Sequence, residues 1–155
     1  MPILLHNNLR CMYFGIFDQE MADRFVKYLL MNPDEFWTPM TLPSIAANDP
    51  SFRNISGNNW SGQPQALTYQ RSIQALENYG HYTELTKIGQ KFLKVTGESL
   101  RFTQQYDPFT MQPDSTMDGY GPALLSALEF ISRLYGVHIT QNKVFWSCLD
   151  SDFNY

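Results

Sequence analysis

Residues 58–80 have the sequence NNWSGQPQALTYQRSIQALENYG and fall into two halves of different character. The first half, 58–65, is polar and turn-forming. The second half, Ala66 to Tyr79, predicts a helix, because apolar residues recur every three or four positions, at Ala66, Tyr69, Ile73, Leu76 and Tyr79. Pro64 suits the first turn of a helix, and Gly80 suits the left-handed residue that ends one. The segment therefore places a loop rich in hydrogen-bonding groups at the start of an amphipathic helix.

The side chains of this loop have the chemistry that binds sugars. An apolar sugar ring packs on an aromatic side chain, and its hydroxyls pair with amides and carboxylates. Trp60 would supply the aromatic surface, with Asn59, Gln63 and Gln65 as hydroxyl partners. The alternative is that Trp60 is a core residue and the loop is only a turn. The segment by itself leaves both interpretations open.

Length and composition indicate a folded chain with an unusual surface. The 155 residues suit one domain, and a hydrophobic content of 43% excludes a disordered polypeptide. Aromatic residues make up 15%, which is high, and charged residues 17%, which is low for a self-contained domain. This balance favours either a carbohydrate-binding cleft or a surface that further protein covers.

Several classes of function find no support in the sequence. The net charge of −4 offers no basic footprint, so we expect no nucleic-acid partner. No apolar run is long enough to span a bilayer, so we expect no membrane partner. Cys11 and Cys148 lie far apart without metal or redox spacing, which predicts buried thiols. We therefore expect no cofactor and no metal, and the sequence assigns no compartment.

The flanking sequence predicts further helices. One begins at the N-cap Asp18 and ends at Asn32-Pro33. A tight turn at Gly80-His81 leads into a helix over 82–96, whose apolar stripe contains Leu85, Ile88, Phe92 and Val95; Gly89 either weakens it or allows a neighbouring helix to approach. The last helix, 122–135, is apolar nearly all round and is expected to need burial on several sides. Weak strand character follows in Val137 to Leu149, around Gln141-Asn142.

Two long polar loops, 34–59 and 97–120, separate these helices. Each leads into a helix N-terminus, whereas Gly80-His81 is tight, so we expect both loops at one end, where they would form one site. Asp49 is a candidate hydroxyl acceptor there, although a turn-forming role is as good an interpretation. His81 at the helix junction is interpreted as structural rather than as a catalytic base.

An ordered series of short motifs carries a family resemblance. It comprises PDEFWTP (33–39), LPSIA (42–46), DP (49–50), NWSGQ (59–63) and YDPFT (106–110). The series resembles the C-terminal part of (α/α)6-barrel glycoside hydrolases, closest to mannosylglycerate hydrolase-like and family 63-like enzymes, with trehalases more distant. The likeness runs from about residue 14 to about residue 146. It implies an all-α fold in which helical hairpins form part of an (α/α)6 toroid, the six-hairpin glycosidase fold, incomplete in this chain.

The resemblance also implies an activity, the inverting hydrolysis of O-glycosidic bonds in carbohydrate metabolism. In such enzymes one carboxylic acid protonates the leaving oxygen and a carboxylate activates water. The base lies just before the Tyr-Asp-Pro run, where this chain has Gln104, and an amide cannot accept a proton at neutral pH. Asp118 is the alternative carboxylate, and Ser61 stands where the family has an arginine.

The same resemblance gives the candidate binding residues. It implies that Trp37 and Trp60 are sugar platforms, accompanied by the polar residues Asp49, Asn59, Gln63, Gln65 and Tyr106. The partners it implies are a carbohydrate substrate and the remainder of a catalytic domain.

Chain length leads to the same expectation of an incomplete toroid. A toroid of six hairpins has twelve helices, and twelve helices of roughly 11 residues with their loops need about 200 residues. The sequence of this chain predicts about four helices. We therefore expect residues 1–155 to be a partial catalytic domain, its C-terminal half, that hydrolyses nothing alone. The alternative is a non-catalytic helical module that binds carbohydrate or protein.

Overall fold

The computed structural model describes residues 3–57, 60–114, 118–139 and 141–146. Within them the fold is helical with one small hairpin, as the resemblance implied. The elements in chain order are α1 (Asn8–Tyr13), α2 (Gln19–Phe25), the π-helix η1 (Val26–Leu30), α3 (Ala66–Glu77), α4 (Tyr82–Ser99), α5 (Gly121–Tyr135), β1 (Val137–Ile139) and β2 (Val144–Trp146).

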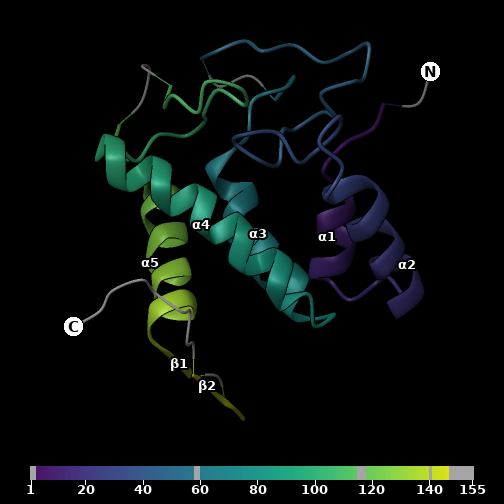
Figure 1. Cartoon of the computed structure of the whole chain (residues 1–155), viewed down its shortest axis with the longest axis vertical. Helices are drawn as coiled ribbons and strands as arrows, with labels where there is room; N and C mark the ends of the chain where they lie inside the picture. The colour runs from purple at the N-terminus through teal and green to yellow at the C-terminus, as the bar shows by residue number, and fades with distance from the viewer. Residues whose placement is uncertain (1–2, 58–59, 115–117, 140, 147–155) are drawn as a thin grey trace.

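Helix α3 lies at the centre and packs against α1, α4 and α5. Helices α1, α3 and α5 all begin at the end of the molecule that carries the long loops, at the top of Figure 1, and run away from it. Helix α4 returns in the opposite direction. The alternation of direction along the chain is that of successive helical hairpins.

Three of the predicted signals for helix ends are confirmed, whereas Pro64 precedes Gln65, the N-cap of α3, and so lies outside the first turn in which it was expected. The Asp18 side chain accepts a hydrogen bond from the Met21 N–H (2.8 Å) at the start of α2. Gly80 has a φ of +73°, the left-handed conformation that lets the chain turn between α3 and α4. The helical path through η1 stops at Met31, just before Asn32-Pro33.

Phe92 on α4 organises the core. Its ring centroid lies 4.6 Å from that of Tyr69 on α3, 5.8 Å from that of Phe130 on α5 and 5.7 Å from that of Tyr106 in the second loop. All four side chains are buried. The apolar stripe predicted for α4 is therefore confirmed as the face that joins three helices and a loop.

Gly89 allows α4 and α5 to approach closely. A Cβ atom at this position would lie 2.6 Å from Cδ1 of Phe130, closer than real side chains come. Of the two roles that the sequence left open for Gly89, the structure confirms close helix approach.

The C-terminal part agrees with two expectations. Strand character was predicted in Val137 to Leu149, around Gln141-Asn142, and these two residues join β1 to β2, which pair antiparallel with Ile139 opposite Val144. The helix that needed burial on several sides is left partly uncovered. Helix α5 is buried only on the side that faces α3 and α4. Its other side exposes five large apolar residues, which we call the α5 stripe: Leu124, Leu125, Leu128, Ile131 and Tyr135.

Candidate functional site

The two long loops meet at one end of the helices, as predicted. The Gly57 N–H donates to the Asp114 carboxylate (2.8 Å), and the Met40 N–H donates to the Pro108 carbonyl (2.9 Å). Figure 1 shows both loops together at the top of the molecule and the turn between α3 and α4 at the opposite end. The helix N-termini of α3 and α5 both open into this region.

A line of side-chain amides, which we call the amide relay, holds the loops together. Gln65 Nε2 donates to Gln105 Oε1 (3.1 Å), and Gln105 Nε2 donates to Gln63 Oε1 (2.6 Å). Gln63 Nε2 donates to Asn54 Oδ1 (2.8 Å), and Asn54 Nδ2 donates to the Asp107 carboxylate (2.7 Å). Asp107 is the final acceptor: burial opposes its ionisation, but hydrogen bonds from Thr110, Asn54 and Phe109 outweigh this and hold its pKa below the ordinary value. Each amide therefore has one fixed orientation.

The amide relay corrects the expectation that Gln63 and Gln65 bind sugar hydroxyls directly. Both side chains are buried, and Gln63 has protein partners at both amide atoms, Asn54 and Gln105. Gln65 Nε2 donates to Gln105 and to the Gln63 backbone carbonyl, whereas Gln65 Oε1 is buried without a partner among the described residues. Gln105, which joins Gln63 to Gln65, was not among the residues predicted for the site. The sequence signal for the amide relay was the two-residue spacing of Gln63 and Gln65. In an extended chain this spacing puts both side chains on the same face, where a third amide can join them.

The two candidate tryptophans have different surroundings. Trp60 has 43% of its surface exposed, and its ring centroid lies 6.0 Å from that of His6. Trp37 is half-buried, and the Lys91 ammonium lies 3.9 Å from its ring centroid, which occupies one face of the indole. Trp60 is thus the better placed of the two to stack on a ligand. Asn59, the other candidate in this motif, lies outside the described residues.

Asp49 acts as a turn-forming residue in this structure. Its carboxylate accepts hydrogen bonds from the Leu4 N–H (3.0 Å) and the Ser51 N–H (2.8 Å). These two bonds lower the pKa of the carboxyl group. The arrangement confirms the Asx-type interpretation and ties the N-terminal segment to the first long loop.

Tyr106 is corrected from a binding residue to a core residue. Its side chain has no exposed surface and packs on Phe92. Burial raises the pKa of its hydroxyl to about 12. A ligand outside the fold cannot reach this ring.

The two candidates for the base position, Gln104 and Asp118, have different surroundings. Gln104 is half-buried, and its backbone carbonyl accepts a hydrogen bond from the Ala66 N–H (2.8 Å) at the start of α3. Asp118 is exposed and accepts from the Phe102 N–H (3.1 Å) and the Gly119 N–H (2.9 Å). Backbone N–H bonds from Gly119 and Phe102, and then Arg101, lower the pKa of Asp118, which makes it a weaker base.

His81 is structural, as expected. Its Nε2 lies 2.9 Å from the Asp23 carboxylate and its Nδ1 lies 3.6 Å from that of Glu84. The ring therefore ties the start of α4 to α2, at the end opposite the loops.

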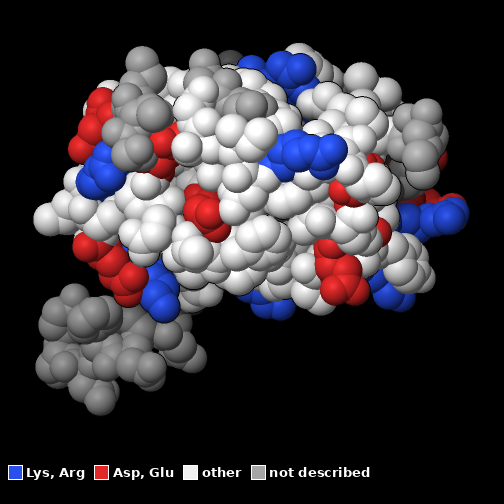
Figure 2. All heavy atoms as spheres, turned by 90° about the horizontal axis from the view of Figure 1, so that it is seen from above, with Lys and Arg blue, Asp and Glu red and all other residues white. Residues whose placement is uncertain are grey.

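Other kinds of site find no basis in the residues that the structure describes. They contain no group of three or more His, Cys, Asp or Glu side chains arranged to hold a metal ion. Nor do they contain a helix of the length and apolarity that a bilayer crossing requires. Seen from the loop end, blue and red residues are interspersed among mostly uncharged ones (Figure 2).

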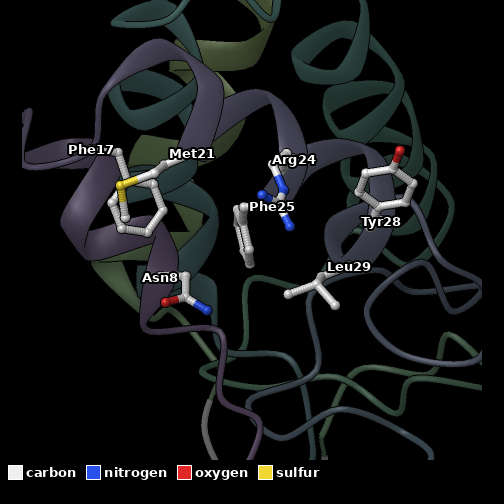
Figure 3. Close-up of a pocket in the computed structure, with 7 residues that line it drawn as sticks. All are labelled: Asn8, Phe17, Met21, Arg24, Phe25, Tyr28 and Leu29. Carbon is white, nitrogen blue, oxygen red and sulfur yellow. The ribbon is translucent and has the colours of Figure 1, made fainter.

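An apolar groove of about 470 Å³ lies beside α1 and α2. Phe17, Met21, Phe25 and Leu29 supply its apolar surface, with Phe25 at its centre, and Arg24 is its charged member (Figure 3). A groove with so few polar groups suits an apolar partner rather than a sugar.

Hairpins that alternate in direction, with polar loops gathered at helix N-termini, define a segment of an α/α toroid. Comparison with protein families gives a match over residues 7–121 to the model described as "Mannosylglycerate hydrolase MGH1-like glycoside hydrolase domain". The chain belongs to this family of glycoside hydrolase domains. A comparison with curated proteins gave no match.

Solved structures share the fold. The mannosylglycerate hydrolase of glycoside hydrolase family 63 from Thermus thermophilus, in complex with glucose, matches with a TM-score of 0.68 and 18% identity, covering 83% of this chain and 30% of that one. Its complex with Tris and D-glycerate gives the same TM-score and identity, with 83% and 29% covered. An uncharacterized conserved protein from the same organism matches with a TM-score of 0.65 and 19% identity, over 83% and 30%. This chain thus spans about 30% of the length of the solved structures it matches.

Proposed function

We propose that this chain supplies a saccharide-binding part of a toroidal glycoside hydrolase that cleaves O-glycosidic bonds with inversion in carbohydrate metabolism. The observation that carries the proposal is the family match over residues 7–121, which includes both long loops. The exposed indole of Trp60 beside these loops supports sugar binding. Residues 1–155 then form a partial catalytic domain, and the remainder of that domain is the partner that completes the toroid.

We further propose that these residues alone do not hydrolyse glycosides. Inverting hydrolysis needs an acid and a base whose carboxyl groups are roughly 6.5–9.5 Å apart. Gln104 occupies the position proposed for the base, and its amide cannot accept a proton at neutral pH. Asp118, the alternative, has its charge satisfied by two N–H groups and Arg101.

Saturation-transfer NMR with methyl α-D-mannopyranoside and methyl α-D-glucopyranoside tests the binding. We expect transfer to the sugar ring protons, lost in Trp60→Ala. Trp146→Ala is the matched control, because Trp146 is an exposed tryptophan on β2, 79% exposed and remote from the loops. Absence of transfer, or equal loss in both variants, would contradict the proposal.

The α5 stripe supports a second candidate, a non-catalytic helical module that binds protein. Such a module would bind its protein partner through the α5 stripe and not through the two long loops. It would retain its partner in Trp60→Ala and give no saturation transfer to either sugar.

A further inference from the structure

The solvent side of α3 carries polar side chains that line a pocket. Gln70, Arg71 and Gln74 lie on this side, between Tyr13 of α1 and Arg133 of α5. Together with their neighbours they line a pocket of about 380 Å³. This volume falls within the range of small-molecule sites.

The polar side chains of this pocket have donors and acceptors that are available to a ligand. Among the described residues, the side chains of Gln70, Arg71 and Gln74 have no hydrogen bond or ion pair. Arg133 differs, because its guanidinium donates to Glu77 (2.5 Å) and is paired with Glu129, so its charge is compensated. The pocket therefore offers two amides and one uncompensated guanidinium to a ligand.

The contrast with α5 argues against an ordinary packing surface. Where α5 is exposed, it shows Leu124, Leu128 and Ile131, as expected of a helix face that further protein covers. Where α3 is exposed, it shows glutamines and an arginine. In a toroid completed by further helices, the α3 side would keep its contact with water or with a polar ligand.

Arg71 also connects this pocket to Trp60. Thr68 Oγ1 lies 3.3 Å from His6 Nε2, and Arg71 follows Thr68 by one turn on the same face of α3, which puts Arg71 on the side of the helix that faces His6. The His6 ring in turn lies 6.0 Å from the Trp60 ring. Gln70 follows Ala66, the first residue of α3, by about 6 Å along the helix axis.

We infer that this pocket is a saccharide site in which Gln70, Arg71 and Gln74 bind the hydroxyls of a sugar whose ring is in reach of Trp60. The inference rests on the proposed function and assigns its hydroxyl partners to α3, in place of the buried amides Gln63 and Gln65. A guanidinium and two primary amides match the alternating donors and acceptors of vicinal hydroxyls.

Titration of the uniformly 15N-labelled chain with D-glucose tests this assignment. We expect the side-chain NH2 signals of Gln70 and Gln74 to shift, with a Kd on the order of 1–10 mM, while those of Gln63, Gln65 and Gln105 stay in place. Arg71→Ala should weaken binding at least about fivefold. Gln90→Ala is the control, since Gln90 is exposed on α4, and it should leave binding unchanged.

Three outcomes would overturn the inference. If the Trp60 indole signal shifts without Gln70 and Gln74, the sugar binds at the loops alone, and the proposed function stands. If sulfate shifts the side-chain NH2 signals of Gln70 and Gln74 and glucose does not, the pocket binds anions only. If glucose shifts neither the indole nor the pocket signals, both the inference and the saccharide-binding function fail. The dispersion of the backbone amide spectrum verifies that each variant is folded.

Discussion

At the scale of single residues, a polar side chain serves either a ligand or the fold, and burial decides between them. Gln63 and Gln65 carry the right groups for sugar hydroxyls but lie inside the amide relay. A buried amide left unpaired costs about 1–3 kcal/mol, so loops with several amides gain by pairing them with one another. Gln70 and Gln74, with the same groups on the solvent side of α3, keep theirs available.

His6 makes stability depend on pH. It is 7% exposed, and burial lowers its pKa from 6.5 to about 4. The unfolded chain therefore binds this proton more readily, and the stability that neutral His6 confers is present above pH 6.5 and lost as pH falls to about 4. We expect the free energy of unfolding to drop by about 3 kcal/mol over this window because of His6.

Urea unfolding of wild type and His6→Gln at pH 7, 5.5 and 4 measures this effect. The variant should show a much flatter dependence between pH 6.5 and 4. Equal slopes in the two proteins would mean that His6 is not the titrating group.

At the scale of elements, two glycines of α4 have opposite roles. Gly89 faces Phe130, whereas a Cβ at Gly97 would have no atom within 4 Å. We expect Gly89→Ala to destabilise the chain by about 1–3 kcal/mol, because the buried Phe130 has to move. Gly97→Ala should stabilise it by about 0.5–1 kcal/mol, because alanine favours the helix.

Chemical denaturation of both variants, read by far-UV circular dichroism, checks these signs. A stabilising Gly89→Ala would contradict the close approach of α4 and α5.

At the scale of the whole molecule, the chain has two apolar edges. Helix α5, which carries the α5 stripe, lies on one side of the molecule, and α1 and α2, which line the apolar groove, lie on the other side (Figure 1). Both are surfaces that a continuing toroid would bury.

We expect the α5 stripe to make the chain associate at high concentration. Leu128, 54% exposed at the centre of the stripe, is the position to change. Leu128→Glu should lower the sedimentation coefficient at high concentration, and Gln90→Glu on α4 should not. A wild-type chain that sediments as a monomer at every concentration would contradict this expectation.

The helices and the gathering of the loops could be predicted from the sequence, because apolar periodicity and turn residues report local structure directly. Asp18, Gly80 and the α4 stripe are examples. Hydrogen-bond partners could not be predicted in the same way. Gln65 meets Gln105 across 40 residues, and Tyr106 is buried by Phe92 from another element. The sequence shows that the loops contain amides suited to sugar hydroxyls. Which of these amides face a ligand depends on tertiary packing.

The most direct test of the account is prolonged incubation of the purified 155-residue chain with α-mannosides and α-glucosides, with released sugar quantified by chromatography. The Thermus mannosylglycerate hydrolase on its own substrate serves as the positive control. General acid and general base catalysis each contribute roughly 10²–10⁴-fold, so a chain without a working pair should release no more sugar than buffer. Turnover above buffer that Asp118→Asn or Gln104→Ala abolishes would contradict the account.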